Sequence, residues 1–514
     1  MQRRTIMTSA SDGQISRRRS LGTISIVAGL VAIWLGMAAA PSAKSQVLTT
    51  LYTFCAQSGC TDGANPLGGL VQGSDGNFYG TTGDGGAGVY CNSVNPPGCG
   101  TVFKITPSGA LTTLYSFCSQ TGCADGDGPD AGLVQGTDGN FYGTTNGGGS
   151  CTTTDVCGTI FKITPSGALT TLYSFCAESG CADGDGPVAG LFQGTDGNFY
   201  GTTSGGGAGS YCPLGTCGTV FKITPAAALT TLYSFCSQTG CADGYEPVAG
   251  LVQGTDGNFY GTTYCGGTGL SNPPCSNGSG TVFRISPNGT LTTLYSFCSQ
   301  SGCTDGQGPS AGLVQGSDGN FYGTTAQGGA NEYNGKYGGT VFKITPSGVL
   351  TTLYSFCSQS GCTDGQFPQA GLIQATDGNF YGTAEIGGAN GLGTAFRITP
   401  TDTLTTLYTF CSQSRCTDGM EPAGELVQGT DGNFYGTTVG GAYNYGTVFK
   451  LSVIPVAILS PSTVTFGSQV VDTTSAPQAV TLSNTGNATL TITGVAASGG
   501  LCPNQQLRKH SGRG

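Results

Sequence analysis

The stretch TDGNFYGTT (Thr137–Thr145) decides the fold, because the chain carries it or a close variant seven times. The aspartate that opens its turn recurs at intervals of 63, 58, 60, 62, 59 and 54 residues. A period of this length is typical of repeat architectures, in which each repeat is one supersecondary unit. We predict hairpin turns at all seven aspartates, which are Asp75, Asp138, Asp196, Asp256, Asp318, Asp377 and Asp431.

One repeat contains four strand candidates separated by turn residues. The segments Ala131–Gly136 and Asn140–Thr145 flank Thr-Asp-Gly, and Asp-Gly between apolar segments is a strong signal for a tight hairpin. After a variable glycine-rich loop, Gly158–Pro165 and Leu169–Phe175 flank a Pro-Ser-Gly turn. β-branched and aromatic residues are enriched in these short segments, which favours strands over helices.

Seven repeats of four short antiparallel strands predict an all-β protein with a seven-bladed β-propeller. The array begins with a lone fourth strand, Leu48–Phe54, and ends with the first three strands of a repeat, through Gly446–Ser452. The N-terminal strand can therefore complete the last blade and close the ring. An open β-array is the alternative.

The order of the strands also assigns the loops to two faces. In an up-and-down blade, the Thr-Asp-Gly and Pro-Ser-Gly turns share one face, which we call the turn face. The loops between second and third strands share the opposite face with the blade-to-blade connections. All length variation falls on this second face, which we call the variable-loop face. Because loops on a rigid scaffold commonly carry function, we expect the binding surface there.

Composition and charge exclude several classes of function. Charged residues make up 9% of the chain, whereas they are roughly a quarter of average proteins. The formal net charge of −10 gives no electrostatic basis for binding nucleic acid or anionic lipid. Of the 23 cysteines, 22 occur in local pairs, which indicates an oxidising compartment.

Residues 1–46 are predicted to be a signal peptide for secretion or cell-surface export. Three arginines, Arg17–Arg19, precede an apolar run that ends at Ala40, and small residues follow it. We expect cleavage after Ala43 and no membrane insertion thereafter. A twin-arginine route and retention of the run as a membrane anchor are the alternatives.

The repeats occupy residues 47–452, and the composition changes after them. Residues 453–500 predict part of an immunoglobulin-like β-sandwich, about half of the roughly 100 residues that such a domain needs. Its expected strands are Thr463–Phe466, Gln478–Ser483 and Ala488–Val495. The basic, polar tail at 501–514 is expected to be disordered, and a shift of reading frame near Gly500 would explain its composition.

The repeat unit LTTLYSFC…DGxxPxAGLVQGTDGNFYGTT…GTVFKITPSG closely resembles the GloVer (Gloeo–Verruco) tandem repeat of bacterial surface proteins over residues 47–452. The segment from Ile454 to Gly500 contains SPSTVTFGSQVVDTTSAPQAVTLSNTGNATLTI and resembles the choice-of-anchor D, HYDIN-like immunoglobulin-like domain, over less than one domain. The first resemblance implies an exported, cell-surface-associated role. It implies no reaction, and it supplies no catalytic residues.

Cysteine spacing predicts eleven local disulfides and leaves Cys502 unpaired. Seven pairs follow the fourth strands as Cys-x4-Cys: Cys55–Cys60, Cys118–Cys123, Cys176–Cys181, Cys236–Cys241, Cys298–Cys303, Cys357–Cys362 and Cys411–Cys416. Four pairs lie in variable loops: Cys91–Cys99, Cys151–Cys157, Cys212–Cys217 and Cys265–Cys275. Zinc is the alternative, but zinc sites favour cysteine with histidine, and the one histidine, His510, lies in the tail.

An Asp-Gly pair follows each second cysteine of the Cys-x4-Cys motifs and predicts a turn into the next blade. Calcium is the alternative, because hard cations take several oxygen ligands and two repeats contain Asp-Gly-Asp. The calcium candidates are Asp125, Asp127, Asp183 and Asp185. The other repeats offer too few ligands, so we expect no cofactor.

Tyrosines in the variable loops are the binding candidates. A tyrosine offers an apolar face and a hydroxyl group, which suit stacking on sugars or docking a protein. Packing within the loops is the alternative role. The candidates are Tyr90, Tyr211, Tyr264, Tyr333, Tyr337, Tyr443 and Tyr445.

We expect no catalytic residues. Residues 47–452 contain no histidine, which excludes Ser-His-Asp and Cys-His chemistry there. Paired carboxylates of a carbohydrate-active hydrolase are the alternative, and the non-repeated acids are Glu246, Glu332, Glu385, Glu421 and Glu425. The sequence therefore predicts an exported, monomeric, non-catalytic protein that binds a glycan or a surface protein. A purely structural envelope protein is the third hypothesis.

Overall fold

The chain divides into two compact units, Leu48–Leu451 and the combination of Met1–Val47 with Ser452–Gly514. In the computed structural model, no helix of the described residues is long and apolar enough to cross a membrane. The structure describes residues 3–8, 48–91, 98–150, 157–211, 217–270, 275, 278–333, 335–452, 457–460 and 478–484.

Leu48–Leu451 form seven antiparallel sheets of four strands each, which confirms the predicted propeller. Blade 1 consists of β3 (Val71–Gln72), β4 (Phe78–Thr82), β5 (Thr101–Ile105) and β6 (Leu111–Ser116). Blade 2 consists of β7 (Val134–Gln135), β8 (Phe141–Thr145), β9 (Thr159–Ile163) and β10 (Leu169–Ser174). Blade 3 consists of β11 (Phe192–Gln193), β12 (Phe199–Thr203), β13 (Thr219–Ile223) and β14 (Leu229–Ser234). Blades 4 and 5 are β15 (Val252–Gln253), β16 (Phe259–Thr263), β17 (Thr281–Ile285), β18 (Leu291–Ser296); and β19 (Val314–Gln315), β20 (Phe321–Thr325), β23 (Thr340–Ile344), β24 (Leu350–Ser355). Blades 6 and 7 are β25 (Ile373–Gln374), β26 (Phe380–Ala384), β27 (Thr394–Ile398), β28 (Leu404–Thr409); and β29 (Val427–Gln428), β30 (Phe434–Thr438), β31 (Thr447–Leu451), β2 (Leu48–Thr53).

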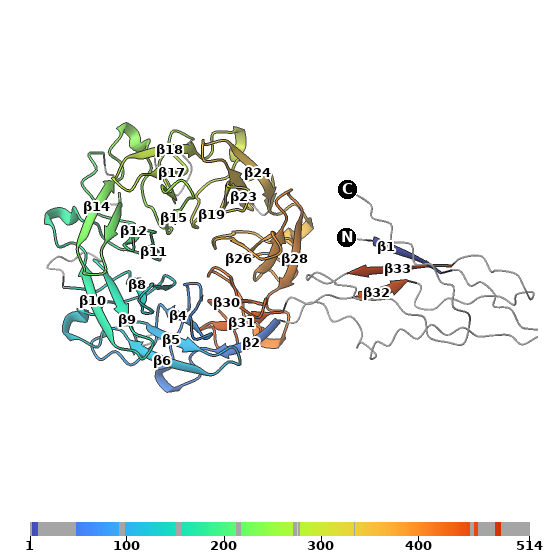
Figure 1. Ribbon diagram of the computed structural model, residues 1–514, viewed down its shortest axis with the longest axis horizontal. Helices are drawn as coiled ribbons and strands as arrows, with labels where there is room; N and C mark the ends of the chain where they lie inside the picture. The colour runs from blue at the N-terminus through green and yellow to red at the C-terminus, as the bar shows by residue number, and fades with distance from the viewer. Residues whose placement is uncertain are drawn as a thin grey trace, which may run out of the picture. The chain divides into compact units, whose positions relative to one another are not determined.

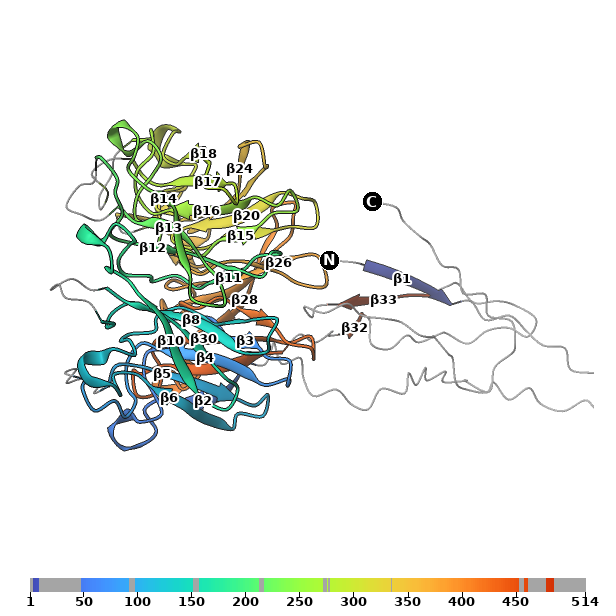
Figure 2. The same cartoon turned by 60° about the vertical axis from the view of Figure 1, so that its left-hand side comes forward.

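The N-terminal strand closes the ring as predicted. Strand β2 pairs antiparallel with β31, with Leu48 opposite Leu451 and Thr53 opposite Thr447. In Figure 1 the seven blades surround a centre, with first strands such as β11 and β15 on the inside and fourth strands such as β14 and β18 on the outside. Figure 2 shows the same ring turned by 60° about the vertical axis.

The innermost strands are shorter than the sequence predicted. Only Val134–Gln135 of the expected segment Ala131–Gly136 pairs with β8. The Ala131 carbonyl instead accepts a hydrogen bond from the Thr81 hydroxyl of the preceding blade, at 2.7 Å. The segment that enters each inner strand is therefore bonded to its neighbour rather than to its own sheet.

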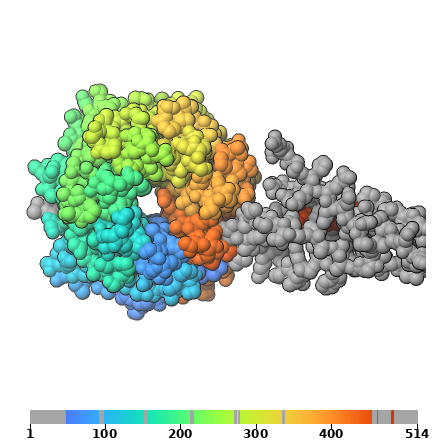
Figure 3. Space-filling model, in the orientation of Figure 1, coloured from blue at the N-terminus to red at the C-terminus, as the bar shows by residue number. Residues whose placement is uncertain are grey.

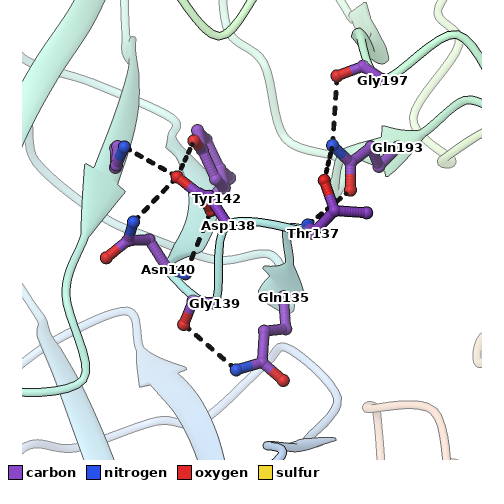
Figure 4. A network of polar contacts seen from close by, with 9 residues as sticks. Gln135, Thr137, Asp138, Gly139, Asn140, Tyr142, Gln193 and Gly197 are labelled. Carbon is purple, nitrogen blue, oxygen red and sulfur yellow. Dashed lines mark hydrogen bonds and ion pairs between the residues drawn. The ribbon is translucent and has the colours of Figure 1, made fainter.

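The Thr-Asp-Gly-Asn turn is held by its aspartate, as predicted. Asp138 accepts hydrogen bonds from the Asn140 backbone N–H at 3.1 Å and from the Tyr142 hydroxyl at 3.0 Å. Gly139 has a φ of 80°, which an L side chain rarely adopts. Figure 4 shows these contacts beside a bond to the next blade, in which the Thr137 N–H donates to the Gln193 amide oxygen.

That bond between blades is repeated around the whole ring. Each inner-strand glutamine accepts from the backbone of the preceding blade at 2.8–3.0 Å, and the Thr430 N–H donates to Gln72 to complete the circle. The hydrophobic core likewise lies between blades. Tyr79 stacks on Phe141 of the next blade with ring centroids 3.9 Å apart, and both side chains are fully buried. The repeat thus closes by seven nearly equivalent interfaces.

Short elements also occur on the variable-loop face. Blade 5 carries a small hairpin of β21 (Glu332–Tyr333) and β22 (Lys336–Tyr337). Each Cys-x4-Cys loop contains one three-residue 3-10 turn: η1 (Ser58–Cys60), η2 (Thr121–Cys123), η3 (Ser179–Cys181), η4 (Thr239–Cys241), η5 (Ser301–Cys303), η6 (Ser360–Cys362) and η7 (Ser414–Cys416).

The second unit contains a three-stranded antiparallel sheet in the order β1 (Arg3–Thr8), β33 (Gln478–Asn484), β32 (Ala457–Ser460). Strand β33 matches the predicted strand at Gln478–Ser483, whereas β1 falls within the expected signal peptide and was not predicted. The remaining predictions for this unit lie outside the described residues, namely Thr463–Phe466, Ala488–Val495, the cleavage site after Ala43 and the tail at 501–514.

Candidate functional site

Disulfides staple the connections on the variable-loop face. Nine of the predicted pairs are disulfides in the structure: Cys55–Cys60, Cys91–Cys99, Cys118–Cys123, Cys176–Cys181, Cys236–Cys241, Cys265–Cys275, Cys298–Cys303, Cys357–Cys362 and Cys411–Cys416. The other two predicted pairs include Cys151 and Cys212, which lie outside the described residues, as does Cys502. The sulfur atoms of the bonded pairs are not available as zinc ligands.

The aspartate after each second cysteine anchors the loop from inside. Asp125 is fully buried and accepts hydrogen bonds from the Tyr115 hydroxyl at 2.8 Å and from the backbone N–H groups of Ser119 and Gln120 at 2.9 and 3.1 Å. The predicted turn is present, since Gly126 has a φ of 107° and its N–H donates to the Cys123 carbonyl at 2.8 Å, and the donors to the aspartate lie five to ten residues earlier. Burial, followed by the hydrogen bond and charge of Asp125, raises the pKa of Tyr115 to about 12.

The calcium candidates do not converge on one site. Asp183 is buried and bonded like Asp125, so internal donors already occupy both carboxylates. Asp127 is half-buried, and burial followed by the charges of Asp84 and Asp125 raises its pKa. Asp185 is half-buried in the equivalent connection of the next blade. In each Asp-Gly-Asp motif, the first aspartate is therefore buried inside the loop, and the second is half-buried on the variable-loop face.

The most exposed candidate tyrosines are spread around the variable-loop face. The exposed fractions are 45% for Tyr90, 50% for Tyr211, 44% for Tyr333 and 61% for Tyr443. These residues belong to the loops of blades 1, 3, 5 and 7, so they do not form one cluster. The Tyr90 backbone N–H donates to Cys118 at 3.1 Å, and Tyr211 makes the same contact with Cys236.

The other candidate tyrosines have different surroundings. Tyr445 is half-buried and packs against the hydrophobic cluster between blades 7 and 1. Tyr264 is half-buried at the end of β16, where its ring lies against Gly308 of the next blade. The Tyr337 side chain lies outside the described residues.

Non-repeated polar side chains lie on the connections that follow second strands or lead into inner strands of the ring, whose central opening is visible in Figure 3. We call this group the channel mouth and define it as Asp84, Asp130, Asn146, Glu246, Tyr264, Gln369, Glu385 and Glu421. Asn146 donates to Asp130 at 3.4 Å. Burial raises the pKa of Asp130 to about 6; the hydrogen bond from Asn146 opposes this rise, and the charges of Asp84 and Asp127 add to it.

Two further groups complete the channel mouth. Burial raises the pKa of Glu246, and burial followed by the charge of Glu246 raises the pKa of Tyr264. In blade 6, Gln369 donates a hydrogen bond to Glu385. Burial and then the neighbouring charge of Glu421 raise the pKa of Glu385. The structure thus brings Glu385 and Glu421 together, while Glu332 lies exposed on β21 of another blade.

The two faces differ in charge. Seven basic residues occupy the same position in the third strands, near the turn aspartates: Lys104, Lys162, Lys222, Arg284, Lys343, Arg397 and Lys450. Lys162 forms an ion pair with Asp138 at 2.8 Å, and Lys450 forms one with Asp431 at 2.9 Å. Residues 47–452 contain two other basic residues, Lys336 and Arg415. The channel mouth is therefore acidic, and most cations lie at the turn face.

Sequence reasoning missed Asp84, Asp130, Asn146 and Gln369 as members of the site. The sequence-based choice of binding residues rested on residue type and named tyrosines, most of which lie in the outer loops of the variable-loop face. A comparison among the seven repeats would have found Asp130, because the residue after the Asp-Gly-x-x-Pro proline is Leu67, Val188, Val248, Ser310, Gln369 or Ala423 elsewhere. The signal is a charged residue at a position where the other six repeats have uncharged residues.

The fold and its stapled loops define a disulfide-rich seven-bladed β-propeller. The chain belongs to the Gloeobacter/Verrucomicrobia repeat family, which matches residues 41–272 and 268–502. A search of curated proteins found no match.

Several solved structures are similar at low identity. Hydrazine synthase of Kuenenia stuttgartiensis is 12% identical, with 77% of this chain and 98% of that chain covered and a TM-score of 0.44. PQQ-bound aldose sugar dehydrogenase of Streptomyces coelicolor is 14% identical, with 80% and 99% covered and a TM-score of 0.34. A luciferin-regenerating enzyme is 11% identical, with 79% and 95% covered and a TM-score of 0.35. These likenesses assign no activity to this chain.

Proposed function

We propose that this chain is an exported protein of the bacterial cell surface that binds a glycan through its variable-loop face. The observation that carries the proposal is the asymmetry of the channel mouth. Asp130 with Asn146, Glu246 with Tyr264, and Gln369 with Glu385 each interrupt the repeat in a different blade. Carboxylates and amides form hydrogen bonds with hydroxyl groups, and tyrosine adds an apolar ring.

The disulfides support the location. Nine local disulfides in the described residues indicate an oxidising, extracellular environment. Export by the segment at 1–46 and attachment to the cell surface are parts of the proposal. The exposed perimeter tyrosines, such as Tyr333 and Tyr443, extend the same face outward and offer additional stacking surfaces.

A glycan and polysaccharide array tests this proposal with the full chain produced under oxidising conditions. We expect saturable binding that is lost in Glu385→Gln and Tyr264→Phe and weakened in Tyr333→Ala and Tyr443→Ala. Lys162→Met at the turn face is the matched control and should bind normally. Binding to a surface protein in the absence of any glycan would contradict the glycan proposal and would assign the face to protein docking. If the chain binds neither a glycan nor a surface protein, a structural envelope protein would be favoured.

A carbohydrate-active hydrolase is a second candidate, because Glu385 and Glu421 lie close enough for the charge of Glu421 to raise the pKa of Glu385. A pair of neighbouring carboxyl groups suits general acid and base roles in glycoside hydrolysis. Reducing-sugar release, measured on the same array, distinguishes the two functions. Release that disappears in both Glu385→Gln and Glu421→Gln would favour the hydrolase, whereas binding without release favours the non-catalytic protein.

A further inference from the structure

Two different disulfides meet at one end of the outer hairpin of blade 1. Strand β5 pairs antiparallel with β6, with Thr101 opposite Ser116. A backbone hydrogen bond of 3.0 Å joins the next two residues, so the register continues beyond the strands. One position further, Cys99 lies opposite Cys118. Cys99 belongs to the disulfide of the variable loop, and Cys118 belongs to the disulfide of the stapled loop.

The sulfur atoms of these two disulfides lie together. The Sγ atoms of Cys91, Cys99 and Cys118 are within 4.8 Å of one another. The fourth sulfur, on Cys123, lies 3.8 Å from the carbonyl oxygen of Tyr90, the residue directly before Cys91. All four cysteines pack in the same hydrophobic cluster. Each sulfur of one disulfide therefore has a sulfur of the other disulfide as a neighbour.

The four sulfurs differ in their access to solvent. Cys99 and Cys118 are buried, whereas Cys91 and Cys123 are half-buried. Disulfides exchange when a thiolate attacks one sulfur, forms a mixed disulfide and expels the other sulfur as a thiolate. A thiol from solution reaches the outer sulfurs first. Attack at Cys91 expels Cys99, which is the buried sulfur beside Cys118.

The same register recurs in blades 2 and 3. Cys157 lies opposite Cys176, and Cys217 lies opposite Cys236, each one position beyond the hydrogen bond that extends the third and fourth strands. These cysteines again pack together in hydrophobic clusters. The other four blades have no cysteine at the position of Cys99, where they carry Ser279, Gly338, Leu392 and Tyr445.

We propose that blade 1 carries a site of thiol–disulfide exchange whose substrates are low-molecular-weight thiols, and that blades 2 and 3 carry equivalent sites. The substrate thiolate bonds to Cys91 and expels the Cys99 thiolate, which bonds to Cys118 and expels the Cys123 thiolate. The Cys123 thiolate then attacks Cys91 and releases the substrate thiol. The products are Cys99–Cys118 and Cys91–Cys123. Two disulfides break and two form, so the cycle consumes neither an oxidant nor a reductant.

The exchange changes the attachment of a loop on the variable-loop face. Cys91–Cys99 closes the loop on its own blade, whereas Cys91–Cys123 joins it to the stapled loop that leads into blade 2. Tyr90, whose side chain is 45% exposed, lies directly before the cysteine that changes partner. A small thiol can thus alter the anchoring of an exposed tyrosine. This site does not depend on the glycan contacts proposed at the channel mouth.

Peptide mapping by mass spectrometry tests the proposal on the full chain. Reduced glutathione is added without denaturant at about pH 8, near the ordinary thiol pKa of about 8.5. Acid then stops the exchange, and pepsin digests the chain without reduction. We expect peptides linked through Cys99–Cys118 that are absent without glutathione. Cys357–Cys362 is the internal control and should keep its pairing, because Gly338 stands opposite Cys357. All samples carry Cys502→Ser, so that the predicted unpaired cysteine cannot supply the thiol.

A variant that needs no added thiol tests the central step. Cys91→Ser leaves Cys99 as a free thiol beside Cys118. We expect this variant to form Cys99–Cys118 unaided, so that N-ethylmaleimide labelling of the unfolded chain finds the free thiol on Cys123. The double variant Cys91→Ser/Cys99→Ser is the matched control, since it has no attacking thiol and should retain Cys118–Cys123.

Three results would overturn the proposal. One is a wild-type chain that forms no Cys99–Cys118 link at any glutathione concentration. Another is a folded Cys91→Ser variant in which the label stays on Cys99. The third is exchange of Cys357–Cys362 at the same rate as the pairs of blade 1, which would show general opening of the fold. Circular dichroism shows whether Cys91→Ser is folded, and the wild-type mapping decides the question if it is not.

Discussion

The turn face and the variable-loop face are built from the same strands, but they use them differently. At the turn face, each Asp-Gly-Asn turn bonds its own asparagine and tyrosine, and each glutamine bonds the neighbouring blade. At the variable-loop face, the stapled loop, its buried aspartate and a backbone bridge beyond each second strand recur, whereas the side chains of the channel mouth differ from blade to blade. Contacts that recur seven times hold the ring together, and the proposed glycan contacts lie where the repeat is interrupted.

This division has an energetic reason. Each interface between blades buries a tyrosine–phenylalanine stack, so a change in one repeat weakens a joint of the ring. On the variable-loop face, side chains such as Tyr443 are mostly exposed instead of being buried in such a stack. Substitution there costs little stability, because exposed residues away from buried contacts rarely change the free energy of unfolding.

Removal of the closing strand should have the largest effect on this comparison. Deletion of Leu48–Phe54 leaves the edge of β31 unpaired and removes Phe54, whose ring packs edge-on against Phe103 at 5.2 Å. We expect loss of cooperative unfolding and self-association through the open edge, measured by thermal denaturation and size-exclusion chromatography. A chain that begins at residue 47 is the control and should keep the ring closed. A cooperative monomer without β2 would contradict closure by this strand.

Truncation of one stacked ring should have the next largest effect. Phe141→Ala empties a fully buried position and removes the stack on Tyr79. Substitutions of this kind cost about 3–5 kcal/mol, which urea denaturation measures as a fall in the free energy of unfolding. Tyr333→Ala on the opposite face should change it by no more than about 0.5 kcal/mol. Similar losses in both variants would show that the two faces are not energetically distinct.

The strands and the closure of the ring were predictable because they depend on signals within one repeat. Asp138-Gly139 marks the hairpin, and the isolated strand at Leu48–Phe54 marks the closure. The length of the inner strands was not predictable in this way. It depends on the bond from Thr81 to Ala131, which joins different blades and leaves no local pattern in the sequence.

The candidate site was predicted only in part, for a related reason. The position of the variable-loop face and its disulfides could be predicted from strand order and cysteine spacing. Which side chains of the channel mouth become neighbours depends on how the blades pack against one another. Glu385 and Glu421 are 36 residues apart by their numbers and become neighbours only when blades 6 and 7 pack together.

The buried aspartate of the stapled loop is the repeated feature of the variable-loop face, and its loss should have an intermediate effect. Asp125→Asn weakens the bonds from Tyr115, Ser119 and Gln120 and should cost about 1–3 kcal/mol. Asp127→Asn, at the half-buried end of the same motif, should cost less, because Asp127 is not the acceptor of the bond from Tyr115. Urea denaturation at neutral pH measures both variants, and equal costs would contradict the anchoring role.

The hydrogen bond from the Tyr115 hydroxyl to Asp125 predicts a loss of stability at high pH. The pKa of Tyr115 is about 12 in the folded chain, whereas an unperturbed tyrosine has a pKa of about 10. The contribution of this group is therefore complete below about pH 10 and is lost as the pH rises toward the folded value. Phenolate absorbance should show one tyrosine fewer among the late-titrating groups in Tyr115→Phe. An unchanged titration would contradict the assignment.

The smallest effect should come from the ion pairs of the turn face. Lys162→Met removes the bond to Asp138 and should cost about 0.2–1 kcal/mol, because the pair is partly exposed. Burial alone would raise the pKa of Asp138, but bonds from Lys162, Asn140 and Tyr142 together lower it. The contribution is thus present above about pH 4, the unperturbed value, and is lost as the pH falls through the lowered pKa. Lys343→Met is the matched control, because Lys343 forms no ion pair in the described structure. Equal costs at neutral pH would mean that the lysine stem, rather than its charge, stabilises the turn, and the turn face would then be equivalent in all seven blades.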